Sequence, residues 1–194
     1  PGLIITTNPF ELKISSLERD RTALLTIYTS LGGASWTNGA NWPNEEDINV
    51  WTGVTIDTGT NRVTGLDISS SNAIGDMPDD LQDIGSLSVL NLSDNQISSL
   101  PDVSSLTLSQ FNVSGNNLDF GDLEPNIEQL GAIENYNNQG LIGAEDREEL
   151  VARGGTFDLT IEAGGTNDQY VWTRLNALGS RTLDNTDETV EIDN

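Results

Sequence analysis

The sequence contains no cysteine and no histidine, and only 8 lysine and arginine residues stand against 31 aspartate and glutamate residues. Without thiols and imidazoles, disulfides, thiolate zinc sites, cysteine nucleophiles and histidine general bases are all excluded. The formal net charge of -23 repels nucleic-acid phosphates and anionic membrane surfaces. We therefore expect no nucleic-acid partner, and any catalysis would have to run on carboxylates alone.

Long hydrophobic runs are also missing. No apolar stretch approaches the roughly 20 residues that a membrane helix requires, so we predict no membrane insertion. The chain begins at Pro1 without the basic and apolar regions of a signal peptide, which indicates a processed or excised piece. Its 194 residues correspond to one large domain or two modest ones.

One apolar pattern recurs three times from Val63 onward. Apolar residues occupy positions one, four and six of a common template, position nine is a small polar residue, and position eleven is apolar. The three sets are Val63, Leu66, Ile68, Ser71 and Ala73; Leu87, Leu90, Leu92, Asn95 and Ile97; and Leu108, Phe111, Val113, Asn116 and Leu118.

The spacing of these sets is that of a leucine-rich repeat. Their periods of 24 and 21 residues lie within the usual length of about 20 to 29. We therefore predict an α/β solenoid of three coils over residues 63–123. In such coils the apolar residues point inward, and the asparagine side chains bond the backbone of neighbouring coils.

Solenoid ends need caps that keep their apolar faces from water. Ser15 and Glu18 have the spacing of a helix capping box, and apolar residues follow at largely helical spacing. Three tryptophans come next in a stretch rich in asparagine and glycine, where burial in a cap core is favoured over a sugar-stacking platform. They are Trp36, Trp42 and Trp51. We predict a helical N-terminal cap over residues 14–62.

A family resemblance rests on three segments: SLERDRTALLTIYTSLGGASWTN at 16–38, WTGVTID at 51–57 and RVTGLDIS at 62–69. They resemble the cap and first repeat of secreted leucine-rich repeat proteins, with those of environmental and marine bacteria closest; plant receptor ectodomains have a similar cap. Plant caps carry cysteine where this chain has Ile56 and its neighbours, which favours the bacterial group.

The resemblance covers residues 14–125, about 60% of the chain. It implies a non-enzymatic interaction or adhesion module that is extracellular or at the cell surface. Its ligand would be a protein or a glycan, read by surface residues that vary freely within the family.

The C-terminal third follows a different pattern. The template ends at Leu123, and residues 124–138 are predicted to be a linker. In the module 139–194, alternating apolar residues from Phe157, a glycine-rich turn and a second strand bearing Trp172 resemble strands B and C of an immunoglobulin-like domain. Because a full sandwich of this kind needs about 100 residues, we predict an incomplete all-β immunoglobulin-like module, truncated or completed by another segment.

The N-terminal extended segment 1–13 contains a short apolar, β-branched run with strand character. The run consists of Leu3, Ile4, Ile5, Thr6 and Thr7. It is either a linker from a preceding module or a donor strand that completes the open sheet of residues 139–194. Donation to the next copy would be a self-association that builds a head-to-tail filament.

Polar residues between the apolar positions form columns on the predicted concave face. The candidate binding residues are Asp67, Ser69, Asn91, Ser93, Asp94, Gln110, Asn112 and Ser114. This face is either a polar ligand surface or ordinary solvated strand surface, and it lacks the aromatic and arginine anchors of binding hot spots.

The acidic clusters along the chain are either solvated surface loops, which are the commoner case, or a calcium site. They lack the sixth-position glycine of a calcium loop, and no aromatic cleft residues accompany them as in a glycosidase. We predict no catalytic residues, no metal site and no cofactor.

Overall fold

The computed structural model of the chain describes residues 15–44, 47–140, 156–160, 164–166, 172–176, 179–183 and 189–193. The predicted donor strand Leu3–Thr7 lies outside these residues. Among the described helices, none combines the length and hydrophobicity needed to cross a bilayer.

The N-terminal cap begins with helix α1, Ser16–Ser30, as the sequence predicts. The Glu18 backbone N–H donates to Oγ of Ser15 at 3.1 Å, which satisfies one of the donors that a helix leaves free at its start. The helix buries one apolar face, including Leu24 and Ile27, against the first coil. Two 3-10 turns follow, Gly33–Ser35 (η1) and Ile48–Val50 (η2).

The three tryptophans of the cap are buried, which confirms the cap-core interpretation. The rings of Trp42 and Trp51 lie 4.4 Å apart between centroids, and Tyr28 stacks on Trp42 at 5.8 Å. The indole N–H of Trp36 donates to the Leu31 carbonyl at 2.9 Å, and that of Trp42 donates to the Thr52 carbonyl at 2.9 Å. The indoles of Trp36 and Trp42 therefore keep a hydrogen-bond partner although they are buried.

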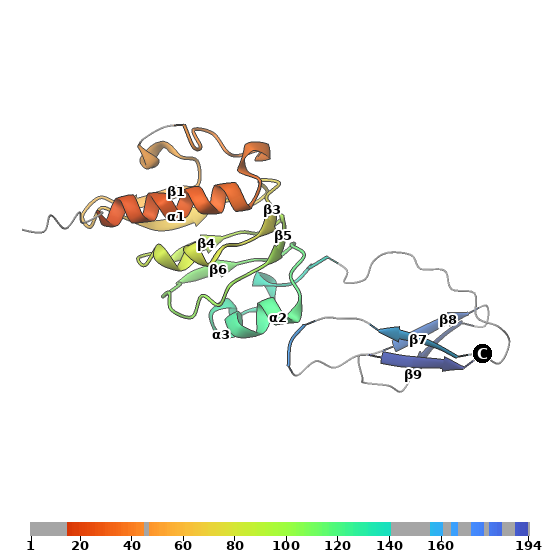
Figure 1. Cartoon of the computed structure of the whole chain (residues 1–194). Helices are drawn as coiled ribbons and strands as arrows, with labels where there is room; N and C mark the ends of the chain where they lie inside the picture. Colours follow the sequence, from red (N-terminus) through yellow and green to blue (C-terminus); the bar gives the residue numbers. More distant parts are fainter. Residues whose placement is uncertain are drawn as a thin grey trace, which may run out of the picture.

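Four strands form the main sheet, in the order β1-β2-β4-β6. Strand β1 (Val54–Asp57) runs antiparallel to β2 (Arg62–Asp67), whereas β4 (Val89–Asn91) and β6 (Gln110–Asn112) run parallel to β2 (Figure 1). The register aligns Leu66, Leu90 and Phe111, which are all buried. The predicted inward-facing row is thus continuous through the three coils.

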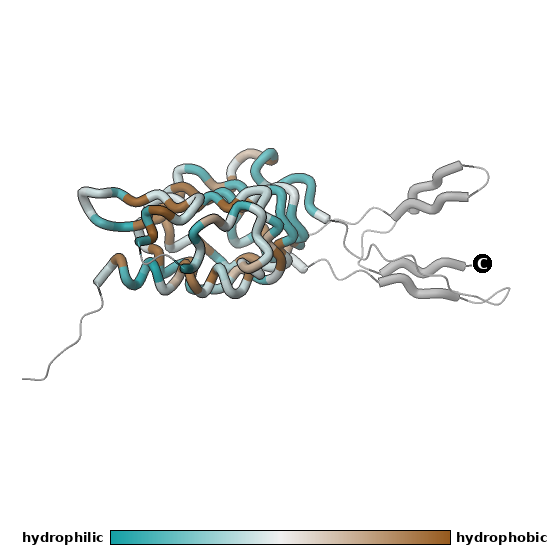
Figure 2. Tube along the Cα trace, turned by 90° about the horizontal axis from the view of Figure 1, so that it is seen from above, coloured by the Kyte–Doolittle hydropathy of each residue, from teal (hydrophilic) through white to brown (hydrophobic). Residues whose placement is uncertain are grey.

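A second sheet lies across the coils from the first. It pairs β3 (Ile74–Asp76) with β5 (Gln96–Ser99) in parallel. The return leg of one coil is the 3-10 helix η3, Asp79–Asp83, which packs against α1. Hydrophobic and hydrophilic segments alternate along the chain in this part of the molecule (Figure 2).

Buried asparagines join the coils, as predicted. Oδ1 of Asn95 accepts from the backbone N–H groups of Ser71 and Ala73, both at 3.0 Å. Asn116 takes the equivalent position one coil later, where its Oδ1 accepts from the Ile97 N–H at 3.0 Å and its Nδ2 donates to the Leu92 carbonyl. These bonds satisfy backbone groups that the turns would otherwise bury without partners.

The solenoid continues past the third coil. The segment predicted as the linker 124–138 contains η4 (Glu124–Asn126), α3 (Ile127–Leu130) and η5 (Ile133–Asn135), preceded by α2 (Phe120–Leu123). Asn126 and Leu130 are buried, so this segment packs onto the third coil instead of leading away from it.

Gln139 continues the series of buried amide side chains formed by Asn95 and Asn116, which we call the asparagine ladder. Its Oε1 accepts from the Leu118 N–H at 3.0 Å, and its Nε2 donates to the Val113 carbonyl at 3.0 Å. It thus repeats the role of Asn116 one coil earlier. Residues 120–140 form a degenerate fourth coil.

The C-terminal module contains four described strands. Strand β7 (Thr156–Thr160) pairs antiparallel with β10 (Thr189–Asp193), and β8 (Trp172–Asn176) pairs antiparallel with β9 (Gly179–Leu183). The sequence predicts strands at β7 and β8, whereas it does not predict β9. The two predicted strands β7 and β8 belong to different sheets. The immunoglobulin-like assignment stays a prediction.

Candidate functional site

The predicted binding residues lie on β2, β4 and β6 and on the turns that follow these strands. Their side chains differ in accessibility. Asp67, Asp94 and Gln110 are exposed, and four more are half-buried. Ser93 is only 7% exposed and contributes little accessible surface, so the structure removes it from the candidate contact residues.

Local hydrogen bonds occupy part of the polar columns. Oδ1 of Asn91 accepts from both N–H and Oγ–H of Ser93, and Oδ1 of Asn112 accepts from the same two groups of Ser114 at 2.9 and 2.8 Å. Oδ1 of Asp67 accepts from a backbone N–H in the same way. These bonds fix the side chains after each strand, so the columns have both a structural role and a remaining set of exposed polar atoms.

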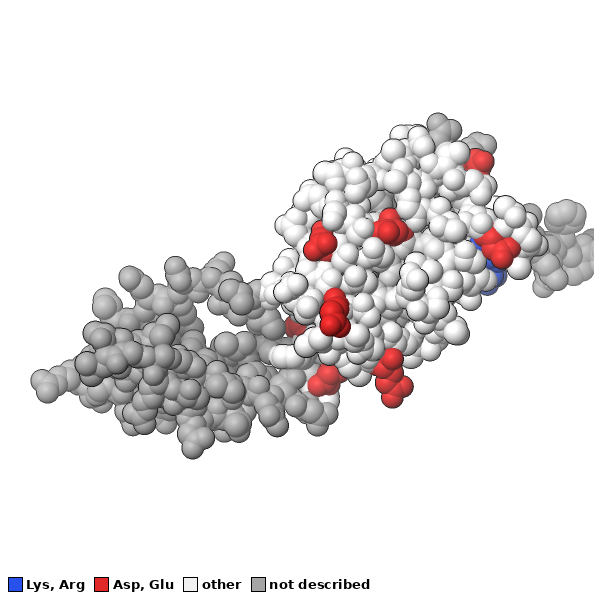
Figure 3. Space-filling view, turned by 180° about the vertical axis from the view of Figure 1, so that it is seen from behind, with Lys and Arg blue, Asp and Glu red and all other residues white. Residues whose placement is uncertain are grey.

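Charge of one sign dominates this part of the molecule. Residues 63–140 contain twelve aspartates and glutamates and no lysine or arginine. Figure 3 shows carboxylates spread over the described surface on one side of the molecule, with basic side chains at a single spot near one end. Such a surface attracts cationic partners and repels anionic ones.

Two exposed carboxylates illustrate why the surface stays ionised. Backbone N–H groups of Thr60 and Gly59 donate to Asp57 and hold the pKa of its carboxyl below the ordinary value. The backbone N–H of Ser104 lowers the pKa of Asp102 in the same way. Hydrogen bonds to the charged form favour that form.

A pocket of about 470 Å³ lies beside β6, the last strand of the main sheet. On one side it is lined by Asn91, Gln110 and Asn112, which are three of the predicted binding residues. Residues from α3 and the turn after it line the other side, among them Gln129 and Ala132. Sequence reasoning missed this second wall because it lies beyond the recognisable template. The pocket volume falls within the range of about 300 to 1,000 Å³ that ligand sites occupy.

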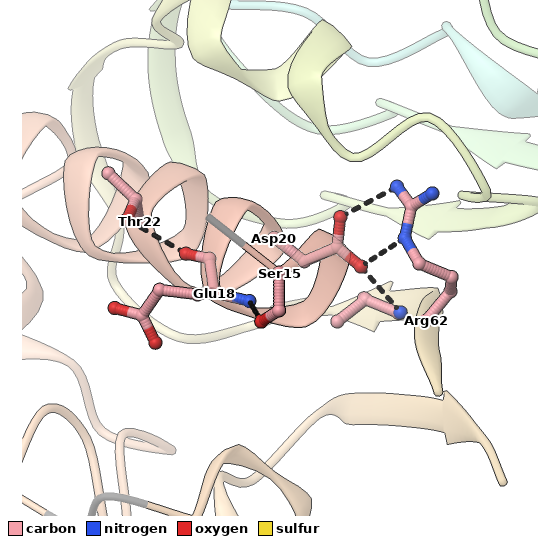
Figure 4. A network of polar contacts seen from close by, with 6 residues as sticks. Ser15, Glu18, Asp20, Thr22 and Arg62 are labelled. Atoms are coloured by element: carbon pink, nitrogen blue, oxygen red, sulfur yellow. Dashed lines mark hydrogen bonds and ion pairs between the residues drawn. The ribbon is translucent and has the colours of Figure 1, made fainter. Parts of the chain in front are cut away.

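The buried ion pair in the cap is structural. Asp20 accepts from Nε and Nη2 of Arg62 at 2.8 and 2.7 Å and from the Val63 N–H at 2.9 Å (Figure 4). This pair ties α1 to the first coil and lines none of the described pockets. Within the described residues, no group of three acidic side chains is placed to hold a metal ion.

Comparisons with solved structures find leucine-rich repeat proteins, including bacterial ones. A leucine-rich repeat protein from Bacteroides eggerthii is 30% identical over 45% of this chain, with a TM-score of 0.39. The BIR2 ectodomain from Arabidopsis thaliana is 28% identical over 51% of the chain, with a TM-score of 0.45. The BIR3–SERK2 complex from the same plant gives 32% identity over 50% of the chain and a TM-score of 0.44.

These matches span only part of the neighbouring proteins. They cover 14% of the Bacteroides protein, 56% of the BIR2 ectodomain and 55% of the matching chain in the BIR3–SERK2 complex. No family model and no curated protein matches the chain.

Proposed function

We propose that this chain is a non-enzymatic interaction module of an extracellular or cell-surface bacterial protein, and that it binds a protein partner through the concave face of β2, β4 and β6. The observation that carries the proposal is the combination on one face of fixed polar columns, a pocket and charge of one sign. The aligned core residues Leu66, Leu90 and Phe111 hold the strands beneath that face in a single register. A preorganised surface loses little entropy on binding.

The chemistry of the face favours a protein over a glycan. Sugar sites use exposed aromatic rings for stacking, and none of the predicted binding residues is aromatic. The carboxylates of Asp67 and Asp94 are exposed, and residues 63–140 contain no lysine or arginine. Lysine and arginine side chains of a partner complement them and raise the association rate.

A random-peptide display library panned on the full chain tests this proposal. We expect the enriched peptides to be basic. Binding of the selected peptides, measured by calorimetry, should weaken about tenfold in the double variant Asp67→Asn/Asp94→Asn, because each exposed charge pair contributes up to about 1 kcal/mol. Asn at position 94 tolerates the left-handed backbone found there, where φ is 57°.

The matched control is Asp79→Asn/Asp83→Asn, which removes the same charge from η3 on the opposite side of the coil. Binding should change little in this control, and the melting temperatures of both double variants should match that of the parent. Equal loss of binding in the two double variants would show that the peptides respond to net charge alone, and the concave face would then not be the binding surface.

A second candidate function is supported by the C-terminal module. Its described strands form two separate two-stranded sheets, so each has edges without a neighbouring strand among the described residues. Open edges are sites for strand addition. The predicted donor strand Leu3–Thr7 of one copy would complete such a sheet in the next copy and build a head-to-tail filament.

Deletion of residues 1–8 separates the two candidates. If the chain forms filaments, the truncated protein should run at the monomer position in size-exclusion chromatography, and the amides of 156–160 and 172–176 should exchange faster with solvent. An unchanged assembly state together with unchanged exchange would leave the segment as a linker and the interaction module as the function.

A further inference from the structure

The fourth coil lacks the strand that each preceding coil contributes to the main sheet. Residues 131–135 instead form a turn that begins at Gly131, with φ of 67°, and continues into η5. Glu134 takes the template position of Leu90 and Phe111 when Gln139 is aligned with Asn116, and it is exposed in this turn, whereas Leu90 and Phe111 are buried. The 470 Å³ pocket lies between β6 and this turn. It therefore occupies the place of the missing strand.

Strand β6 is the edge of the main sheet. Its only neighbour among the described strands is β4. Both α3 and η5 lie near β6. Among the described residues, the backbone hydrogen bonds to the fourth coil begin beyond the end of β6, where the Val113 N–H donates to the Asn135 carbonyl at 2.7 Å. An edge strand presents backbone N–H and C=O groups that can pair with another chain. The three residues Gln110–Asn112 span about 10 Å of this edge. The Gln110 N–H and the Asn112 carbonyl already bond Ser88 and Leu92 of the preceding coil, so Phe111 is the residue whose backbone groups face outward.

Gln129 lines the same pocket, and its side-chain amide contains a buried acceptor. Nε2 of Gln129 donates to the Val103 carbonyl at 2.8 Å, which fixes the orientation of the amide. Its Oε1 is buried and has no donor among the described atoms. A buried polar atom without a partner costs stability, so a ligand N–H that reached it would be favoured.

The charge around the pocket specifies the ligand further. Glu128 and Glu134 are exposed and adjoin the lining residues Gln129 and Asn135 in the sequence, and no lysine or arginine occurs in residues 63–140. In an added strand, side chains alternate between the two faces of the sheet. Residues opposite Phe111 would point into the pocket, and their neighbours would point toward the acidic concave surface.

We propose that this pocket binds an extended segment of the partner protein, which adds as a strand to the β6 edge and carries lysine or arginine at alternate positions. The proposal rests on the interaction function above and names the chemistry of the partner. The backbone of the segment pairs with β6, its apolar side chains fill the pocket, and its cationic side chains lie over the carboxylates.

The capped synthetic peptide Val-Lys-Val-Lys-Val-Lys is the probe. Added to the isotope-labelled full chain, it should shift the amide NMR signals of residues 109–113 and 129–135. The Val-Glu counterpart should leave these signals unchanged because of repulsion. A version of the Val-Lys peptide with every backbone nitrogen methylated keeps its charges but cannot donate, and it should not bind.

The variant Ala132→Trp places a large ring in the pocket from an exposed position and should weaken binding about tenfold or more by steric exclusion. Ala34→Trp, at an exposed position in the cap, is the matched control and should bind like the parent. Circular dichroism establishes that both variants fold.

Three results would overturn the proposal: equal binding of the methylated peptide, equal binding by Ala132→Trp, or signal shifts spread over the surface without concentration at the two segments. If display-selected peptides still depend on Asp67 and Asp94 while Ala132→Trp binds them normally, the strand site fails and the concave interaction face stands. If the display-selected peptides bind the Asp67→Asn/Asp94→Asn variant as tightly as the parent, the function proposed for the concave face is wrong, whatever the result for the strand site.

Discussion

Asp20 shows how a single charged residue can hold two elements together. Its side chain is fully buried, and its two oxygens accept three hydrogen bonds from Arg62 and from the Val63 backbone. The carboxylate raises the pKa of the Arg62 guanidinium through these hydrogen bonds. The pair connects the cap helix to the first strand of the coils, so we expect its loss to loosen the N-terminal end.

We predict that Asp20→Ala lowers the free energy of unfolding by about 3 kcal/mol, near the lower end for breaking a buried ion pair. The lower end applies because the Arg62 side chain is 22% exposed and can reach water. Urea denaturation measures the effect. Glu18→Gln removes the surface partner of Arg21, at 3.8 Å, and should cost less than about 1 kcal/mol. Equal costs for the two variants would contradict this structural role of Asp20.

The roles of the buried asparagines could be predicted from the sequence, whereas that of Asp20 could not. Asn95 and Asn116 repeat at a fixed template position, so their inward role was predicted and is confirmed. Asp20 stands on a helix where an aspartate is ordinarily solvated, and its partner lies 42 residues away. No local pattern encodes such a pair, because it exists only after the helix packs on the coil.

At the scale of elements, the strands of the coils depend on the aligned core row. We predict that Leu90→Ala costs about 2 to 5 kcal/mol, the usual range for truncating a core leucine. Leu90 is central because it lies between Leu66 and Phe111 in the sheet. Ile74→Ala is the control, since Ile74 is 49% exposed and surface truncations change stability by roughly 0.5 kcal/mol or less. An unchanged denaturant midpoint for Leu90→Ala would rule out the repeat assignment.

The fourth coil marks the limit of the template. With Gln139 at position nine, positions one and four fall on Gly131 and Glu134, which are not apolar. The pattern therefore stops, although Gln139 still makes the ladder bonds of an asparagine. The same loss of apolar positions accounts for the missing strand and for the pocket beside β6. The recognisable repeats were thus predictable, whereas the second wall of the pocket was not.

For the whole molecule, charge is the dominant property. A net charge of -23 produces mutual repulsion among carboxylates, which salt screens within about 10 Å at 0.1 M ionic strength. We predict that the melting temperature rises with moderate sodium chloride. Calcium at matched ionic strength should add little, and scanning calorimetry compares the two. A saturable calcium effect at micromolar concentration would reveal a metal site and contradict this expectation.

In the proposed function, the partner binds to the concave face of β2, β4 and β6. Hydrogen exchange of the full chain, with and without a saturating display-selected peptide, tests it most directly. The bound peptide should slow exchange of amides in residues 64–70, 88–94 and 109–115 and leave those of η3, residues 79–83, unchanged. Protection confined to η3, or absent from all three concave segments, would contradict it.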